Sequence, residues 1–213
     1  MLAEPGTDAL FPTRQSLLTR LHDCADQEGW REFFDSYWRL IYNVARKSGL
    51  ADAEAQDVVQ NTFVYLARRM PRFRYDRTRG AFKSWLRAVT RSRISVYRRR
   101  EKADPKFKLE PLYGDEDEDS SLIEQMPDPA ADRLDEVWQR EWEENLLKSA
   151  FRRVRSKVTS QQLLIFRTAS IEKLSAGQVA RKLGVSLAQV YLARHRVGKL
   201  LKAEVEQLRR ETE

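Results

Sequence analysis

Apolar side chains recur every three or four residues along most of the chain, which is the spacing of a helix with one buried face. The strongest pattern begins at Trp30, after a weaker one from residue 13, and stops before Gly49. Its apolar positions are Trp30, Phe33, Phe34, Tyr37, Leu40, Ile41 and Val44. They predict a long helix in the core of an N-terminal helical domain.

A second helix is predicted over residues 52–70, because Asp52 suits a helix start and Pro71 disfavours helix at the residue before it. Its inward stripe consists of Val59, Phe63, Leu66 and Met70. A second and mostly polar stripe runs along the other side of this helix and consists of Asp57, Gln60, Asn61, Val64 and Arg68. The helix is therefore predicted to bury one side and to present the other.

Residues 80–100 predict a third helix with two unlike faces. The apolar face consists of Phe82, Trp85, Leu86, Val89 and Val96. The other face is basic and consists of Lys83, Arg87, Arg91 and Arg98, with Ser84 and Ser95 among them. Such a helix packs by one face and offers arginines to a phosphate backbone with the other, although a solvated basic face has the same pattern.

The segment between these two helices alternates cations with aromatic rings. It contains Arg72, Phe73, Arg74, Tyr75, Arg77 and Arg79. Rings can stack on unpaired bases while arginines hold phosphates, so one interpretation is a binding loop for single-stranded nucleic acid. The alternative is that the rings fix the loop to the core.

Three helix starts follow one another in the C-terminal part, each with the Ser/Thr-x-x-Gln pattern of a capping box, at Thr159, Ser175 and Ser186. A short helix before Gly184 and a longer one from Leu187 predict a helix-turn-helix. The buried stripe of the longer helix is predicted at Val190, Ala193, Val197, Leu200 and Leu201. Outward positions are Gln189, Tyr191, Leu192, His195, Arg196 and Lys199, of which glutamine and arginine can contact base edges and lysine suits phosphate.

Composition supports an all-α fold, because Gly and Pro number only 8 and 7 among 213 residues. Residues 101–131 contain four prolines and an acidic run, and they predict a flexible acidic linker. The expected organisation is two small helical domains, 13–100 and 132–213, joined by that linker. No apolar run approaches the ~20 residues of a membrane span, so a soluble cytoplasmic protein is expected. The single cysteine, Cys24, excludes an intramolecular disulfide and is expected to be buried.

Charge is segregated along the chain, although the net value is only +7. Residues 68–108 carry a net charge of +13 and residues 148–213 one of +10, whereas residues 109–147 between them carry −12. Two basic blocks around an acidic one predict two surfaces for a polyanion, joined by a segment that the polyanion would repel.

Catalytic patterns are missing from the sequence. It has no glycine-rich phosphate loop, no Cys or His spacing for zinc and no supported Ser-His or Cys-His pair. No enzyme activity, metal or cofactor is therefore expected. A helix-turn-helix repressor or activator that acts without polymerase is the alternative function, but it leaves the polar stripe of residues 52–70 and the aromatic–basic loop unexplained.

Taken together, these motifs resemble bacterial sigma factors of the sigma-70 family, extracytoplasmic-function (ECF) group, over residues 17–208. The resemblance rests on Asp-x-x-Gln-x-x-Phe from Asp57, the aromatic–basic loop, Phe-x-x-Trp-Leu from Phe82, and Ala-x-x-Leu-Gly-Val-Ser from Ala180. It departs from many relatives at Ser92, Val96 and Arg194, which leaves the promoter sequence preference open.

The resemblance implies a sigma factor that binds core RNA polymerase and directs promoter-specific initiation, including promoter melting. Its partners would be the polymerase clamp and flap region, promoter DNA and an anti-sigma factor. The clamp would contact Asp57, Gln60, Asn61, Val64 and Arg68. The minus-ten element and its melted strand would contact Arg72, Phe73, Arg74, Tyr75, Arg79, Lys83, Arg87, Arg91, Ser92, Ser95 and Arg98. The minus-thirty-five element would contact Ser186, Gln189, Tyr191, Leu192, His195, Arg196 and Lys199.

Overall fold

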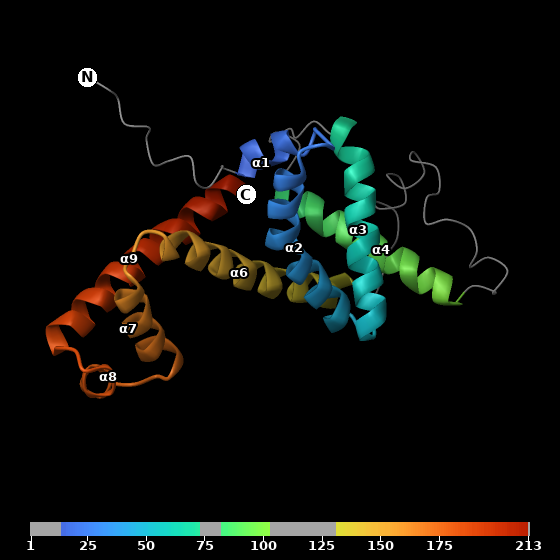
Figure 1. Ribbon diagram of the computed structural model, residues 1–213. Helices are drawn as coiled ribbons and strands as arrows, with labels where there is room; N and C mark the ends of the chain where they lie inside the picture. The colour runs from blue at the N-terminus through green and yellow to red at the C-terminus, as the bar shows by residue number, and fades with distance from the viewer. Residues whose placement is uncertain (1–13, 73–81, 103–130, 213) are drawn as a thin grey trace, which may run out of the picture. The chain divides into compact units, whose positions relative to one another are not determined.

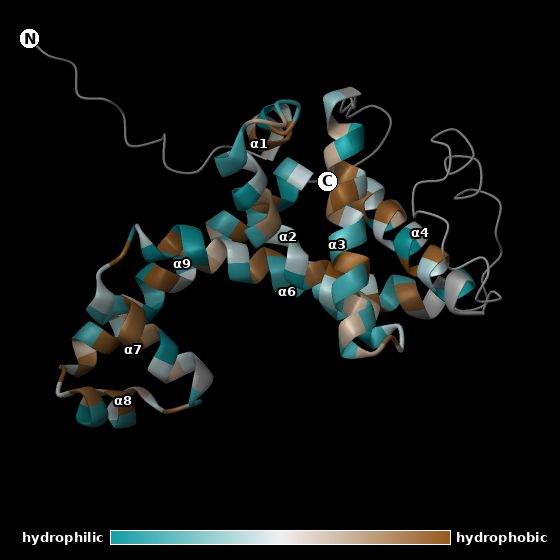
Figure 2. Cartoon of the chain, turned by 45° about the vertical axis from the view of Figure 1, so that its right-hand side comes forward, coloured by the Kyte–Doolittle hydropathy of each residue, from teal (hydrophilic) through white to brown (hydrophobic). Residues whose placement is uncertain are grey.

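A computed structural model describes residues 14–72, 82–102 and 131–212, and helices are the only regular elements within these ranges (Figure 1). The α-helices are α1 (Arg14–Arg20), α2 (Gln27–Lys47), α3 (Asp52–Arg69), α4 (Phe82–Lys102), α6 (Ala131–Arg155), α7 (Ser160–Ile171), α8 (Ala176–Leu183) and α9 (Leu187–Thr212). A short 3-10 helix, Met70–Arg72, follows α3. The predicted all-α class is confirmed, and each helix carries both apolar and polar residues (Figure 2).

The chain divides into two compact units between Asn145 and Leu146, inside α6. The N-terminal unit contains α1 to α4 and the first part of α6, and the C-terminal unit contains the rest of α6, then α7, α8 and α9 up to Glu211. Residues 132–145 therefore lie with the N-terminal helices. The predicted linker falls outside the described residues except at its two ends, which belong to α4 and α6.

Two tryptophans of α6 complete the aromatic core of the N-terminal unit. Trp142 is fully buried, and its ring lies 6.3 Å from that of Tyr37 on α2 and 6.4 Å from that of Phe82 on α4. Trp138 stacks on Trp142 with 5.8 Å between ring centroids. Burying rings of this size is among the largest single contributions to a small core.

A buried carboxylate adds a polar link between α6 and α2. Glu141 is only 2% exposed, and its Oε2 accepts a hydrogen bond of 2.7 Å from Nδ2 of Asn43. Lys47, one turn further along α2, donates to the other carboxylate oxygen. A buried charge is tolerated when it is paired and hydrogen-bonded in this way, so the contact also fixes the register of α6 on α2.

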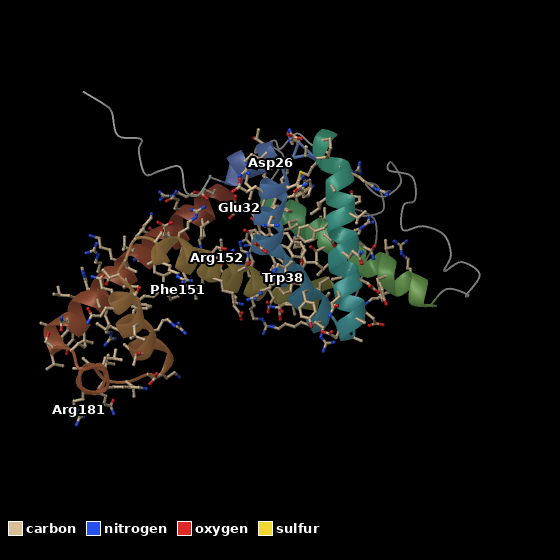
Figure 3. All side chains as sticks on the ribbon, in the orientation of Figure 1. Asp26, Glu32, Trp38, Phe151, Arg152 and Arg181 are labelled. Carbon is tan, nitrogen blue, oxygen red and sulfur yellow. The ribbon has the colours of Figure 1, made fainter. Side chains whose placement is uncertain are left out.

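The start of α2 is held by an acidic N-cap. The Asp26 carboxylate accepts from the backbone N–H of Gly29 at 2.8 Å and from the Arg20 guanidinium on α1 at 2.7 and 2.9 Å. Glu32, labelled with Asp26 in Figure 3, lies 3.5 Å from the same guanidinium. Chiefly because of the hydrogen bond from Arg20, the pKa of Asp26 falls to about 2.

The low pKa of Asp26 predicts a pH-dependent contribution to stability. A carboxyl whose pKa is lower when folded stabilises the fold above its ordinary pKa of 3.8, and this stabilisation is lost as the pH falls towards about 2. Asp26→Asn should therefore lower the urea midpoint of the N-terminal unit at pH 5, and the difference from the unmodified protein should shrink at pH 2.5. Asp35→Asn, exposed on the same helix, is the control. A difference that is equal at both pH values would contradict the assignment.

The C-terminal unit contains the predicted helix-turn-helix, α8 and α9. All three capping boxes form: Ser175 N donates to Gln178 Oε1 at 2.9 Å, and the boxes at Thr159 and Ser186 repeat the pattern. Gly184 ends α8 with φ of 64°, a conformation that favours glycine. The small core of this motif consists of Ile165, Ala169, Ala176, Val179, Ala180, Val190 and Ala193.

Gly198 lies inside α9 at a position where alanine should make the protein more stable. A β-carbon added there would meet only one ring carbon of Phe166, at 3.9 Å, which is an ordinary contact. Because glycine within a helix costs about 0.5–1 kcal/mol relative to alanine, Gly198→Ala should raise the free energy of unfolding by that amount. Thermal melting followed by circular dichroism would show the increase, and an unchanged or lower midpoint would contradict it.

Some side chains differ from the sequence prediction. Phe34 was expected in the core but is 40% exposed, and Cys24 is exposed rather than buried. On α4, Trp85 and Val96 are only half-buried, whereas Arg93 and Ile94 join the buried face. The buried arginine keeps its guanidinium 4.4 Å from the ring centroid of Tyr65, a cation–π contact that compensates part of its desolvation.

Candidate nucleic-acid and protein interfaces

An aromatic groove runs between α2 and α3 on the surface of the N-terminal unit. It has a volume of about 990 Å³. One wall comes from α2 and consists of Trp30, Phe34, Trp38 and Tyr42; the other comes from α3 and consists of Gln56, Val59, Gln60, Phe63, Val64 and Ala67. We call this feature the α2/α3 groove. Its lining is almost entirely apolar, which is typical of a site for an apolar helix face or ligand.

Aromatic rings of the α2 wall contact one another and the opposite wall at the surface, outside the core. Phe34 stacks on Trp38 with centroids 6.1 Å apart, and it meets Phe63 of the opposite wall at 4.8 Å. The Arg39 guanidinium lies 5.1 Å from the Trp38 ring. At one end, Tyr42 donates a hydrogen bond to Asp52, which ties α2 to α3 and raises the pKa of the tyrosine hydroxyl. These ring contacts and the hydrogen bond hold the two walls of the groove together.

The stripe predicted to contact polymerase borders this groove. Gln60 and Val64 line it directly, while Asp57 and Arg68 are exposed and Asn61 is half-buried on the same helix. The inward side of α3 consists instead of Ala55, Val58, Val59, Thr62 and Leu66. The residues predicted to contact polymerase therefore lie on a different side of α3 from most of the residues that face the core.

Several cations on α4 have partners within the N-terminal unit. Arg87 pairs with Asp135 of α6 at 3.3 Å, and the Lys83 ammonium lies 5.9 Å from the Trp142 ring. Arg98 donates to the carbonyl oxygen of Ser48 just after α2. Arg91 is half-buried, as are Ser92 and Ser95. The basic face is present, but part of its charge is engaged by α6 and by the end of α2.

The aromatic–basic loop falls outside the description. Phe73, Arg74, Tyr75 and Arg79 lie outside the described residues, and of Arg72 only the backbone is described, in the 3-10 helix after α3. Their predicted roles stay predictions.

All seven residues predicted for the second DNA-contacting surface are exposed on or just before α9. They are Ser186, Gln189, Tyr191, Leu192, His195, Arg196 and Lys199. Arg181, which extends from α8 (Figure 3), adds a further exposed cation to this motif. Gln189 also has a structural role, because its Oε1 accepts the backbone N–H of Ser186 at 2.8 Å. A bidentate contact to adenine uses both amide atoms, so Oε1 would have to accept a second hydrogen bond or release this one.

The described ranges contain neither a cluster of metal-ligating side chains nor a membrane-spanning helix. Within 14–72, 82–102 and 131–212, no group of three or more His, Cys, Asp or Glu side chains could hold a metal ion. In the same ranges, no helix has both the length and the apolar character that crossing a bilayer requires.

Comparison with known proteins finds a family match within the N-terminal unit. The family model described as Sigma-70 region 2 matches residues 33–103, which include most of α2, all of α3 and α4. A solved structure described as CnrH in complex with the cytosolic domain of CnrY aligns with 90% of this chain and 96% of that chain, at 17% identity and a TM-score of 0.35. A TM-score this low supports no further comparison, and no curated protein matches the chain. The family match therefore identifies residues 33–103, about a third of the chain, as similar to region 2 of sigma-70 factors.

Proposed function

We propose that this chain is a sigma factor of the ECF group, which binds core RNA polymerase and directs promoter-specific initiation. One observation carries the proposal: the family match spans both the α2/α3 groove and the basic face of α4. An apolar groove and a basic helix face thus occur together in the part of the chain that resembles region 2. The ECF assignment is supported by the layout, a region 2 followed by a helix-turn-helix with a short intervening segment.

The α2/α3 groove is the proposed site for the polymerase clamp. An amphipathic helix can place its apolar side chains against Trp38 and Phe63 while its polar side meets Gln60 and Asp57 at the rim. An apolar centre with a polar edge is the usual anatomy of such an interface. Aromatic residues are also enriched among those that contribute most to binding.

Promoter DNA is the proposed ligand of α4 and α9. The cations of α4 suit the minus-ten region, where the loop before α4 would hold the melted strand. Turning a base out of the duplex costs a few kcal/mol, which stacking on aromatic rings and charge contacts can offset. The exposed face of α9 suits the major groove of the minus-thirty-five element. The flap region and an anti-sigma factor stay predicted partners.

Run-off transcription would test this proposal. Purified chain and core RNA polymerase are mixed with a library of random promoter templates, and the transcripts are sequenced. We expect transcripts from a subset of templates that share two short elements, and no such enrichment from core polymerase alone. The proposal is wrong if the chain never enriches a template. It is also wrong if the chain forms a stable dimer that binds duplex DNA and does not associate with polymerase, as a helix-turn-helix repressor would.

A further inference from the structure

Leu192 is the most exposed large apolar side chain in the part of the chain that the structure describes, at 69%. It lies on α9 in line with Ala188, His195 and Lys199, spaced i, i+4, i+7 and i+11 from Ala188, and all four are exposed. The buried stripe of the same helix is on the opposite side and consists of Val190, Ala193 and Val197. The leucine therefore occupies the centre of the outward face, one turn from a small alanine.

The segment of sequence that contains this leucine is strongly basic. Between Glu172 and Glu204 the sequence contains no Asp or Glu, and its seven cations are Lys173, Arg181, Lys182, Arg194, Arg196, Lys199 and Lys202. A surface of that charge is complementary to a polyanion rather than to an apolar protein partner. Among groups that a DNA duplex offers in its major groove, the C5 methyl of thymine is the apolar one.

We propose that Leu192, with Ala188 beside it, contacts the C5 methyl group of a thymine in the upstream promoter element and so determines specificity at that base pair. The inference rests on the proposed function. It also explains how α9 can discriminate bases while Gln189 is engaged in the capping box, because a methyl contact needs no hydrogen-bonding group. Lys199 on the same line and Arg196 beside it remain for phosphate or guanine.

Replacing thymine by uracil tests the contact, since uracil lacks only the methyl group. Polymerase holoenzyme containing the full chain first selects its upstream element from a random library. Each thymine of that element, on either strand, is then replaced by uracil in turn. Binding of the holoenzyme to each uracil template is measured in competition with the unmodified template. We expect one or two positions at which uracil weakens binding roughly three- to fivefold, the factor for one methyl group. In Leu192→Ala holoenzyme, most of the preference for thymine over uracil at those positions should be lost, with at most a small remainder from the alanine methyl groups.

Leu164→Ala is the matched control, because Leu164 is 52% exposed on α7 of the same unit and should leave the thymine preference intact. The inference is overturned if no thymine is sensitive to loss of its methyl, or if Leu192→Ala keeps the preference. A holoenzyme that selects no sequence at all overturns the proposed function and this inference together. Selection without any methyl dependence overturns this inference alone.

Discussion

The double substitution Gln60→Arg, Val64→Arg should abolish co-purification of this chain with core RNA polymerase. Both side chains line the α2/α3 groove, so a helix seated there would have to desolvate two guanidinium groups without a partner. Removing a central contact of an interface often costs more than 2 kcal/mol, and two added charges should lower the affinity at least about a hundredfold. Pull-down of core polymerase followed by titration would measure the loss.

The fold should survive this change, because Gln60 is exposed and Val64 is only half-buried. A circular dichroism melt within about 2 °C of the unmodified protein would show this, since a surface change away from the core alters stability by less than ~0.5 kcal/mol. Gln139→Arg, the same kind of change at an exposed position of α6 outside the groove, is the matched control and should bind normally. Normal binding by the double variant would refute the groove as the polymerase site.

Trp142→Ala should destabilise the N-terminal unit by about 3–5 kcal/mol, the range for removing a buried tryptophan from a core. The ring is fully buried between residues of α2 and α4, and a close-packed core relaxes only partly into the space that a removed ring leaves. Guanidinium unfolding followed by near-ultraviolet circular dichroism would report the aromatic core directly.

The control for this loss is Gln139→Ala, three residues before Trp142 on the same part of α6. Gln139 is exposed, so its truncation should change stability by no more than about 0.5 kcal/mol. Similar stability of the Trp142→Ala and Gln139→Ala variants would mean that this part of α6 does not belong to the N-terminal core. Because the chain has two units, the two transitions must be fitted separately.

Helix positions and caps were predictable because they depend on neighbours in the sequence. The three capping boxes formed as their four-residue patterns indicated, and Gly184 adopted the left-handed conformation that ends a helix. Local hydrogen bonds of this kind need no tertiary information. The all-α class followed from the same periodic signals.

The α2/α3 groove was missed although its signal is in the sequence. Trp30, Phe34, Trp38 and Tyr42 recur every fourth residue, beside the core stripe that contains Phe33 and Tyr37. The spacing does not separate these two stripes, so the prediction assigned apolar residues of both to the core. Phe34 was therefore expected to be buried. Hydrophobic periodicity indicates which residues avoid water but not whether a protein core or a partner covers them.

Contacts between distant segments could not be inferred from spacing. The pairing of Arg87 with Asp135 joins residues 48 positions apart, and the hydrogen bond from Asn43 to Glu141 joins residues 98 apart. Neither local propensity nor charge pattern selects one such partner among many. For the same reason, the location of residues 132–145 with the N-terminal helices was not foreseen.

The position of Trp142 in the N-terminal core has a consequence during protein synthesis. Ribosomes add about 5–20 residues per second, so the 98 residues that separate Asn43 from Glu141 take roughly 5–20 seconds to make. Until α6 has been made, the rings of Tyr37 and Phe82 lack the cover of Trp142. A nascent chain that stops before residue 138 therefore leaves the ribosome with an uncovered aromatic surface. Release of a stable N-terminal unit thus depends on continued translation into α6.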